Sequence, residues 1–343
     1  MFAGDWAIMQ GDARAMLWWL PTDSVDLILT DPPYYRVKGA AWDRQWDTPS
    51  AYLEWLDTVA EEWQRVLKPN GSLYVFASPR MAARVEVLLS ERFNVLNNIT
   101  WRKANQSYAE QYGPENFRSY VDMSERIIFC EQYGSDERAD SDAGWREAEV
   151  ALKKRIFGDY LASEFDRAGV TRKEIAALFP SKTGGIINRM SNWLLGYGIP
   201  TPDQWDAMRD YLNGLNGGEY LRREYEELRR EYEELRREYE ELRRPFNLTA
   251  KDQFTDVWNF RPVAAYPGKH ECEKPQALLR HIIQASSRPG DLVLDSFAGS
   301  GSTGVAALAL RRRFIGIEIS EHWARYAERR LADGVQLTLE GVA

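Results

Sequence analysis

The sequence predicts an α/β fold that is built on a parallel sheet and carries a helical insertion and a heptad-repeat helix. Near the amino end, a short apolar strand at residues 5–12 is followed by a helix and a second apolar strand. The same strand–helix–strand order returns at residues 292–318. Between these two parts, residues 146–213 carry only helical patterns, and residues 221–244 repeat one seven-residue unit. With 343 residues, the chain can form one large α/β domain with an insertion, or two domains.

Composition narrows the class of protein. The net charge of −8 argues against a nucleic-acid binder, but much of the acid lies in segments 131–149 and 221–244, so a local basic cleft stays compatible with it. No apolar run has the length of a membrane span, and residues 1–5 lack a signal-peptide pattern. Cys130 and Cys272 are the only cysteines, which is typical of a reducing cytoplasm.

The amino half reads as alternating helices and strands. Asp12 is expected to cap a helix at 13–20, and an amphipathic helix is expected at 49–67 with Ser50 as its cap. A turn at 68–71, a strand at 72–77, a helix to 91, and strands at 95–101 and 126–130 follow. Lys38 and Lys103 lie in the polar segments between these elements and are candidates for contacts with a polyanion.

The strand at 25–29 ends in an unusual stretch, Thr30-Asp31-Pro32-Pro33-Tyr34-Tyr35. Neither proline can donate to a sheet ladder, so the strand has to end there. A carboxylate and an aromatic ring are thereby placed at the carboxyl end of a strand, where open α/β sheets bind ligands. A plain Asp-Pro turn is the alternative, but it does not need two prolines followed by two tyrosines.

The helical region contains a pattern typical of a helix-turn-helix. Residues 171–179 and 186–193 form two short helical stretches joined by a turn at 180–185. The second helix and the turn before it would present Lys182, Asn188 and Arg189 to a major groove. A small helical bundle with an ordinary surface is the alternative.

The repeat at 221–244 has the spacing of a heptad helix. Leucines recur every seven residues from Leu221 to Leu242, and a tyrosine follows each of the first three leucines by four positions. Pro245 ends the helix. Pairing between two chains, which would give a homodimer, and packing against the parent domain are both compatible with this pattern, because tyrosine is a poor choice at the core of a coiled coil.

A glycine-rich motif follows the strand at 292–295. Gly299, Gly301 and Gly304 have the spacing of a nucleotide-binding loop, and Glu318 ends the next strand about 20 residues later. Glycines let the backbone approach a ligand closely, and a carboxylate at that strand end can hold the hydroxyls of a ribose. The sequence therefore predicts a nucleotide-type cofactor at this end of the sheet.

A dinucleotide-dependent oxidoreductase is the competing class for such a motif. Too few residues follow Glu318 to complete a sheet, so the missing strands have to be those at residues 5–130, and the sheet is circularly permuted. Asp295 and Phe297 precede the glycines and suit an ammonium group and an adenine or sulfonium better than a pyrophosphate.

These residues together resemble the amino-group DNA methyltransferases that use S-adenosylmethionine. The stretches Asp31-Pro32-Pro33-Tyr34 and Asp295-Ser296-Phe297-Ala298-Gly299-Ser300-Gly301 are similar to two motifs of that family, and Glu273-Lys274-Pro275 is similar to a third. Their order along the chain resembles the family's β group. The resemblance covers roughly residues 5–130 and 245–335.

The resemblance implies a Rossmann-like methyltransferase sheet and a reaction on double-stranded DNA in the cytoplasm of a bacterium, from a bacterial or phage gene. Asp at the first motif position favours the N6 amine of adenine, with the N4 amine of cytosine as the alternative. A flipped base would present its amine to Asp31 and the Pro32 carbonyl, beside Pro33 and under the ring of Tyr34. No metal is expected, since the three histidines lack metal-ligand spacing. Cofactor contacts are expected from Asp12, Lys274, Asp295, Phe297, Gly299, Gly301, Ser302, Thr303 and Glu318.

The expected domain order follows from these motifs. Residues 1–134 form the catalytic half of the methyltransferase domain, and residues 245–343 form its cofactor-binding half. Residues 146–220 form a helical insertion for target recognition, and residues 221–244 form the heptad helix. A role in restriction-modification is compatible with this organisation.

Overall fold

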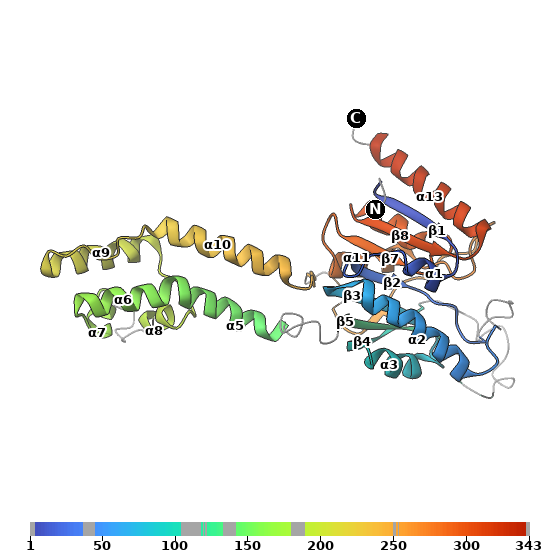
Figure 1. Cartoon of the computed structure of the whole chain (residues 1–343), viewed down its shortest axis with the longest axis horizontal. Helices are drawn as coiled ribbons and strands as arrows, with labels where there is room; N and C mark the ends of the chain where they lie inside the picture. The colour runs from blue at the N-terminus through green and yellow to red at the C-terminus, as the bar shows by residue number, and fades with distance from the viewer. Residues whose placement is uncertain are drawn as a thin grey trace. The chain divides into compact units, whose positions relative to one another are not determined.

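The chain divides into two compact units. The computed structural model describes residues 4–36, 45–103, 118, 120, 122–132, 142–179, 189–249, 252 and 254–340. Unit 1 comprises residues 1–139 and 244–343, and unit 2 comprises residues 140–243 (Figure 1). The described elements of unit 2 are all helical. No helix in the described ranges is both long and apolar enough to cross a membrane.

Unit 1 is built on an eight-stranded sheet of order β1-β8-β7-β2-β3-β5-β4-β6 (Figure 1). The strands in that order are β1 (Trp6–Gln10), β8 (Arg313–Glu318), β7 (Leu292–Asp295), β2 (Val25–Thr30), β3 (Leu67–Ala77), β5 (Ser124–Gln132), β4 (Phe93–Arg102) and β6 (Val257–Asn259). Strands β7 and β8, from the carboxyl end of the chain, are inserted between β1 and β2 and run parallel to both. The predicted permuted, Rossmann-like α/β sheet is therefore confirmed.

Successive strand residues point to opposite sides of the sheet, so both faces carry apolar side chains, and helices cover both. Ile28 packs with the helices of one face, and its neighbours Leu27 and Leu29 pack with those of the other. The first face carries α1 (Ala13–Leu17), α2 (Pro49–Val66) and α3 (Ala82–Ser90). The second face carries α11 (Gln276–Ser286), α12 (Ser302–Ala309) and α13 (Glu321–Glu340). The strand ends between the two layers are thus left open for a site.

Three local expectations in unit 1 need correction. Helix α2 is capped by Thr48, whose Oγ1 accepts from the Ala51 N–H at 3.1 Å, and not by Ser50, because Pro49 already occupies the first helical turn. The expected turn at 68–71 is part of β3 and forms a bulge in the pairing with β2. Strand β5 runs antiparallel to both neighbours, so the sheet is mixed and not wholly parallel.

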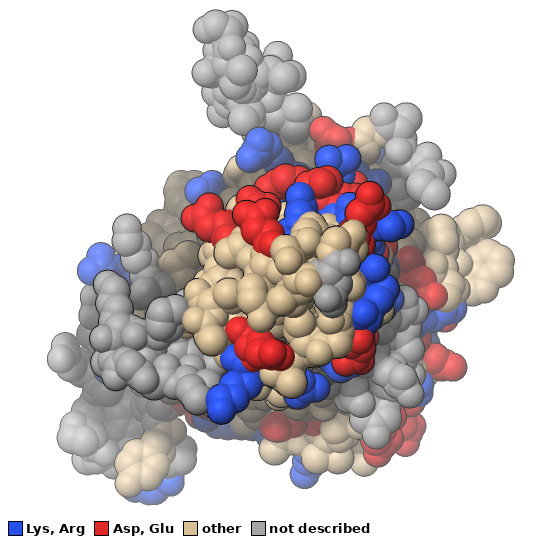
Figure 2. All heavy atoms as spheres, turned by 90° about the vertical axis from the view of Figure 1, so that its left-hand side faces the viewer, with Lys and Arg blue, Asp and Glu red and all other residues tan. Residues whose placement is uncertain are grey.

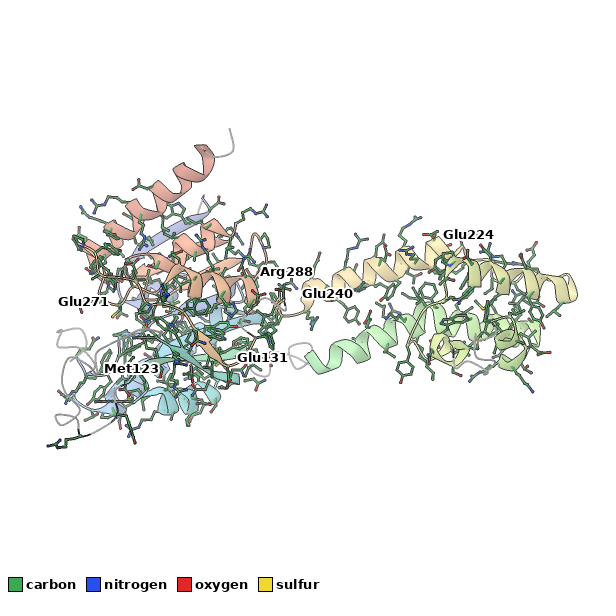
Figure 3. All side chains as sticks on the ribbon, turned by 180° about the vertical axis from the view of Figure 1, so that it is seen from behind. Met123, Glu131, Glu224, Glu240, Glu271 and Arg288 are labelled. Carbon is green, nitrogen blue, oxygen red and sulfur yellow. The ribbon has the colours of Figure 1, made fainter. Side chains whose placement is uncertain are left out.

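Unit 2 has its own core of buried aromatic and aliphatic side chains, centred on Phe157 and Trp205. Its elements are α5 (Asp142–Lys153), the π-helical turn η3 (Lys154–Gly158), α6 (Asp159–Ala168), α7 (Arg172–Ala177), α8 (Arg189–Leu194), α9 (Pro202–Asn216) and α10 (Tyr225–Leu242). In Figure 3, Glu224 lies just before α10, and its carboxylate pairs with Arg209 of α9 (Nη2–Oε2 3.2 Å).

Helices α7 and α8 correspond to the expected helix-turn-helix pair. A capping box of Thr171 and Glu174 begins α7. The ring of Phe179, just beyond α7, contacts Trp193 of α8 edge-on, with centroids 5.5 Å apart. Residues 180–188, which include Lys182 and Asn188, lie outside the described residues, and helix α8 begins at Arg189.

Helix α10 packs part of its heptad pattern inside unit 2. Tyr225, Leu228 and Tyr232 are buried in the core of unit 2. The hydroxyl of Tyr225 donates to the Pro200 carbonyl, and that of Tyr232 donates to Glu149, both at 3.0 Å. These heptad positions therefore pack against the parent unit. The helix begins four residues after Leu221, whose φ of +48° is incompatible with a right-handed helix.

Candidate active site

A cavity of about 750 Å³ opens at the carboxyl ends of the parallel strands in unit 1. Its lining includes Asp31 and Tyr34 after β2, Asp295 at the end of β7 with Phe297 after it, and Glu318 at the end of β8. Glu271, which is labelled in Figure 3, also lines it. Parallel strands end at the same edge of a sheet, so the two motifs meet although they are far apart in the sequence.

The two motifs are joined by direct hydrogen bonds. Thr30 Oγ1 donates to Asp295 Oδ1 at 3.0 Å and accepts from the Ser296 N–H at 3.2 Å. Thr303 Oγ1 donates to Asp295 Oδ2 at 2.6 Å, and the Phe297 N–H donates to Oδ1. Burial raises the pKa of Asp295 to about 6. Asp295 and Thr303 therefore brace the loop after β7 as well as lining the cavity.

The glycine loop has the backbone that its sequence predicts. Gly299 and Gly301 adopt left-handed φ values of +50° and +76°. A Cβ on Gly301 would lie 3.0 Å from the Cβ of Ala327 in α13, and a Cβ on Gly299 would lie 3.1 Å from the ring of His270. The loop therefore fits closely between α13 and the segment before α11, and a side chain at either position would crowd these neighbours and strain the backbone.

Glu318 ties β8 to this loop. Its Oε2 accepts from the Gly299 N–H at 2.9 Å, and its Oε1 accepts from the Ser320 N–H at 2.8 Å. Burial raises the pKa of Glu318. A carboxylate so oriented at the rim of the cavity retains lone pairs for the hydroxyl groups of a ligand.

Aromatic side chains form one wall of the cavity. The ring of Phe297 lies 5.7 Å from the ring of Trp55 in α2, and both line the cavity. Trp323 of α13 and His270 contact each other edge-on, with centroids 4.5 Å apart, on another part of the lining. Flat apolar surfaces of this kind can hold an adenine ring or a base.

Asp31 lies in a cluster of charged side chains. Lys274 Nζ is 2.5 Å from Asp31 Oδ2 and 3.1 Å from Glu125 Oε2, and Glu125 also pairs with Lys103. Burial raises the pKa of Glu125, but Lys274 and Lys103 outweigh burial and hold it at about 2. Burial likewise lowers the pKa of Lys274, and Asp31 and Glu125 outweigh this and raise it. The hydroxyl of Tyr34 donates to Glu125 Oε2 at 3.1 Å.

Most of the residues expected at the site do line the cavity. Asp12, Ser302 and both prolines are part of the lining, and Asp12 also caps α1 as expected. Ser302 Oγ donates a hydrogen bond to Glu273 Oε1 at 3.3 Å and accepts one from Arg330 Nη1 at 3.2 Å. Lys103 was expected to contact a polyanion, but its ammonium group pairs with Glu125 in the cavity. Lys38 lies outside the described residues.

Sequence reasoning missed Glu125, Trp55 and Trp323. Glu125 lies directly before the strand expected at 126–130, and an acid at that strand edge was the only available signal. Trp55 and Trp323 lie on helices, where an aromatic residue is more often part of the core than of a site. Their roles emerge only once the helices are packed on the sheet.

Comparison with known proteins agrees with this geometry. A family model described as DNA methylase matches residues 25–329. The chain is 28% identical over 330 residues to the DNA adenine methyltransferase YhdJ of Escherichia coli (strain K12), covering 94% of this chain and 82% of that protein. It is 25% identical over 346 residues to the Type II methyltransferase M2.DpnII of Streptococcus pneumoniae, covering 94% and 88% of the two chains.

Two solved structures share the fold. The structure of TTHA0409 from Thermus thermophilus, complexed with S-adenosyl-L-methionine, matches with a TM-score of 0.50 and 21% identity, covering 96% of this chain and 93% of that one. The PvuII DNA methyltransferase (cytosine-N4-specific) matches with a TM-score of 0.51 and 14% identity, covering 98% and 94%. The family match spans most of the chain, and the protein therefore belongs to the N6 and N4 DNA methylase family.

Proposed function

We propose that the protein transfers a methyl group from S-adenosylmethionine to the N6 amine of adenine in double-stranded DNA. One observation carries this proposal: the Asp31 carboxylate and the glycine loop with Glu318 line the same cavity. The Escherichia coli relative is a DNA adenine methyltransferase, which favours adenine over the N4 amine of cytosine.

The cavity residues fit S-adenosylmethionine. A volume of about 750 Å³ lies within the range of about 300–1,000 Å³ that is usual for ligand pockets. Gly299 presents only backbone to the cavity, whereas Gly301 is not among the lining residues and packs against Ala327 of α13. We assign Glu318 to the ribose hydroxyls and Phe297 with Trp55 to the adenine ring. Asp12, Asp295, Ser302 and Thr303 are proposed as further cofactor contacts.

When bound, S-adenosylmethionine supplies an electrophilic methyl group. An exocyclic amine is a weak nucleophile because its lone pair is delocalised into the base, and the duplex hides it until the base is flipped out. In the proposed reaction Asp31 accepts one N–H of the amine and the Pro32 carbonyl accepts the other, so that the nitrogen lone pair is freed and oriented. Tyr34 stacks on the flipped base, and Pro33 stiffens the turn. Orientation supplies most of the acceleration.

We assign target recognition to the helices of unit 2, with Lys182, Asn188 and Arg189 at the groove-reading position. The packing of α7 against α8 through Phe179 and Trp193 supports this assignment. Figure 2, which faces one end of unit 2, shows acidic and basic side chains intermixed around other residues. The described surface seen there has no continuous basic patch, so contacts would depend on a few placed cations.

A homodimer that pairs through the heptad helix is less favoured once the packing of α10 in unit 2 is known. Tyr225, Leu228 and Tyr232 are buried inside unit 2, whereas Tyr239, near the end of α10, is exposed and would be accessible to another chain. We place the protein in the bacterial cytoplasm, where its DNA substrate lies.

Nucleoside analysis tests the proposed function. The purified protein is incubated with S-adenosylmethionine and unmethylated duplex DNA, and the digested DNA is examined by mass spectrometry. N6-methyladenine is the expected product. N4-methylcytosine in its place would reassign the target base, and the absence of any methylated nucleoside would refute the proposed reaction.

A further inference from the structure

Four charged side chains from separate segments of unit 1 form one cluster in the cavity: Asp31, Lys103, Glu125 and Lys274. Lys274 lies between the two acids, with Nζ 2.5 Å from Asp31 Oδ2 and 3.1 Å from Glu125 Oε2. The other oxygen of Glu125 pairs with Lys103. Of these four groups, only Asp31 contacts the reacting amine in the proposed reaction. Of the other three, Lys274 is buried and Glu125 and Lys103 are partly buried, so their pairing calls for an explanation.

The two oxygens of Asp31 differ in their surroundings. Oδ2 accepts from Lys274, whereas Oδ1 is buried and has no hydrogen-bond partner among the described residues. An unpaired buried acceptor is costly, so it marks a place where a ligand group can bind. We propose that Lys274, held in turn by Glu125, is a positioning residue for methyl transfer: it fixes Oδ2 of Asp31 and leaves Oδ1 as the acceptor for the target amine. The proposal rests on the proposed function.

Lys274 also affects the protonation of Asp31, because its positive charge lowers the pKa of that carboxyl group. Burial raises the pKa of Asp31, and a protonated Asp31 would no longer accept through both oxygens. The Lys274 cation acts against burial, and the Glu125 anion acts with it. Lys274 and Glu125 therefore bias Asp31 in opposite directions.

Other titratable groups also face this pair within the described structure. Asp295 and Tyr34 lie near Asp31, and Cys272 lies near Lys274. Lys103 reaches Asp31 only through Glu125. A change in the pH profile of methyl transfer can therefore be traced to Asp31 if variants of Lys274 and Glu125 move it in opposite directions.

The experiment measures kcat for methyl transfer to DNA across pH in the full chain, for the wild type, Lys274→Met and Glu125→Gln. Asp31 has to be ionised, so activity is lost as pH falls through its pKa. In Lys274→Met the acid limb of the profile is expected to move up by about one to three pH units, with at least about a tenfold loss of kcat at neutral pH. Cofactor affinity, measured by calorimetry, is expected to be unchanged.

In Glu125→Gln the acid limb is expected to move down, because an anion near Asp31 has been removed. Lys68→Met is a matched control, since Lys68 forms an ion pair of 2.5 Å with Asp26 near the other end of β2. The Lys68→Met variant removes a lysine–aspartate ion pair of the same length, and its pH profile of kcat should coincide with that of the wild type.

An unmoved limb in both cavity variants, or a loss of cofactor affinity in Lys274→Met, would overturn the positioning role while the wild-type enzyme remained active. If Lys274→Met does not fold, Glu125→Gln decides alone: a downward shift supports the role, and no shift refutes it. A wild-type protein that transfers no methyl group to DNA would instead refute the proposed function itself.

Discussion

Asp31 and Glu318 are two acidic residues of the cavity with different proposed roles, one in methyl transfer and one in cofactor binding. Asp31 follows β2 and keeps one carboxylate oxygen without a partner in the described structure. Glu318 ends β8, and its oxygens hold two backbone N–H groups of the surrounding loops. We therefore expect substitutions at the two acids to separate chemistry from cofactor binding.

Glu318→Ala should weaken binding of S-adenosylmethionine by about 10- to 100-fold, because hydrogen bonds to a charged group contribute about 1.5–3 kcal/mol. Isothermal titration calorimetry measures this directly. Glu321→Ala is the control, since Glu321 lies on the exposed side of α13 and pairs only with the exposed Arg325 among described residues. Equal affinities for Glu318→Ala and the wild type would remove Glu318 from the ribose site.

The heptad helix shows that one sequence pattern is compatible with two kinds of packing, of which its first half adopts packing within unit 2. Tyrosine is unusual in a coiled-coil core, and here Tyr225 donates to Pro200 and Tyr232 to Glu149 within unit 2. A polar hydroxyl that finds a partner in its own unit explains why tyrosine is tolerated at these positions. Helix α10 therefore acts as part of a helical core along its first half.

Leu228→Ala should destabilise unit 2 by about 2–5 kcal/mol, because Leu228 is fully buried in its core. Tyr239→Ala, on the exposed part of the same helix, should change stability by less than about 0.5 kcal/mol. Chemical denaturation followed by circular dichroism compares the two. Similar losses from both would mean that Tyr239 is also packed, as it would be in a dimer.

The helices α7 and α8 carry the prediction for DNA binding. Substituting Lys182 or Arg189 by Ala should weaken binding to duplex DNA by severalfold and lower its salt dependence, since each lost phosphate contact removes one released counterion. Gel-shift titrations at several salt concentrations measure both effects. Arg229→Ala on α10, which breaks the Arg229–Glu233 pair, is the control. Unchanged binding in both variants would refute the helix-turn-helix role.

The whole molecule contains two separate cores, one around the sheet and one among the helices of unit 2. Calorimetry should therefore resolve two unfolding transitions. S-adenosylmethionine should raise only the transition of unit 1, because a ligand stabilises the unit that binds it. Leu228→Ala identifies the other transition by lowering it. A single transition that shifts as a whole with the cofactor would contradict independent units.

Much of this architecture could be predicted from the sequence because its signals are local. The double proline after Asp31 and the glycines after Asp295 each mark a strand end, and strand ends of a parallel sheet share an edge. The family and the fold class were thereby predicted, and both are confirmed.

What could not be predicted depends on contacts between distant segments. The direction of β5 is set by its pairing with β3 and β4, and its own residues do not encode it. The direct pairing of Lys274 with Asp31 and Glu125 joins three segments that lie far apart in the sequence, and no local pattern predicts that pairing. The sequence motif predicts a cofactor contact for Lys274. The ion pair between Lys274 and Asp31 supports a role in orienting Asp31 instead.

The most direct test is modification-sensitive sequencing of DNA from methylation-deficient cells that express the wild-type chain or its Asp31→Ala variant. The account predicts N6-methyladenine at one sequence context with the wild type and no modification with the variant, while the purified variant still binds S-adenosylmethionine. Undiminished methylation by Asp31→Ala, or a modified base other than adenine in the wild-type sample, would contradict it.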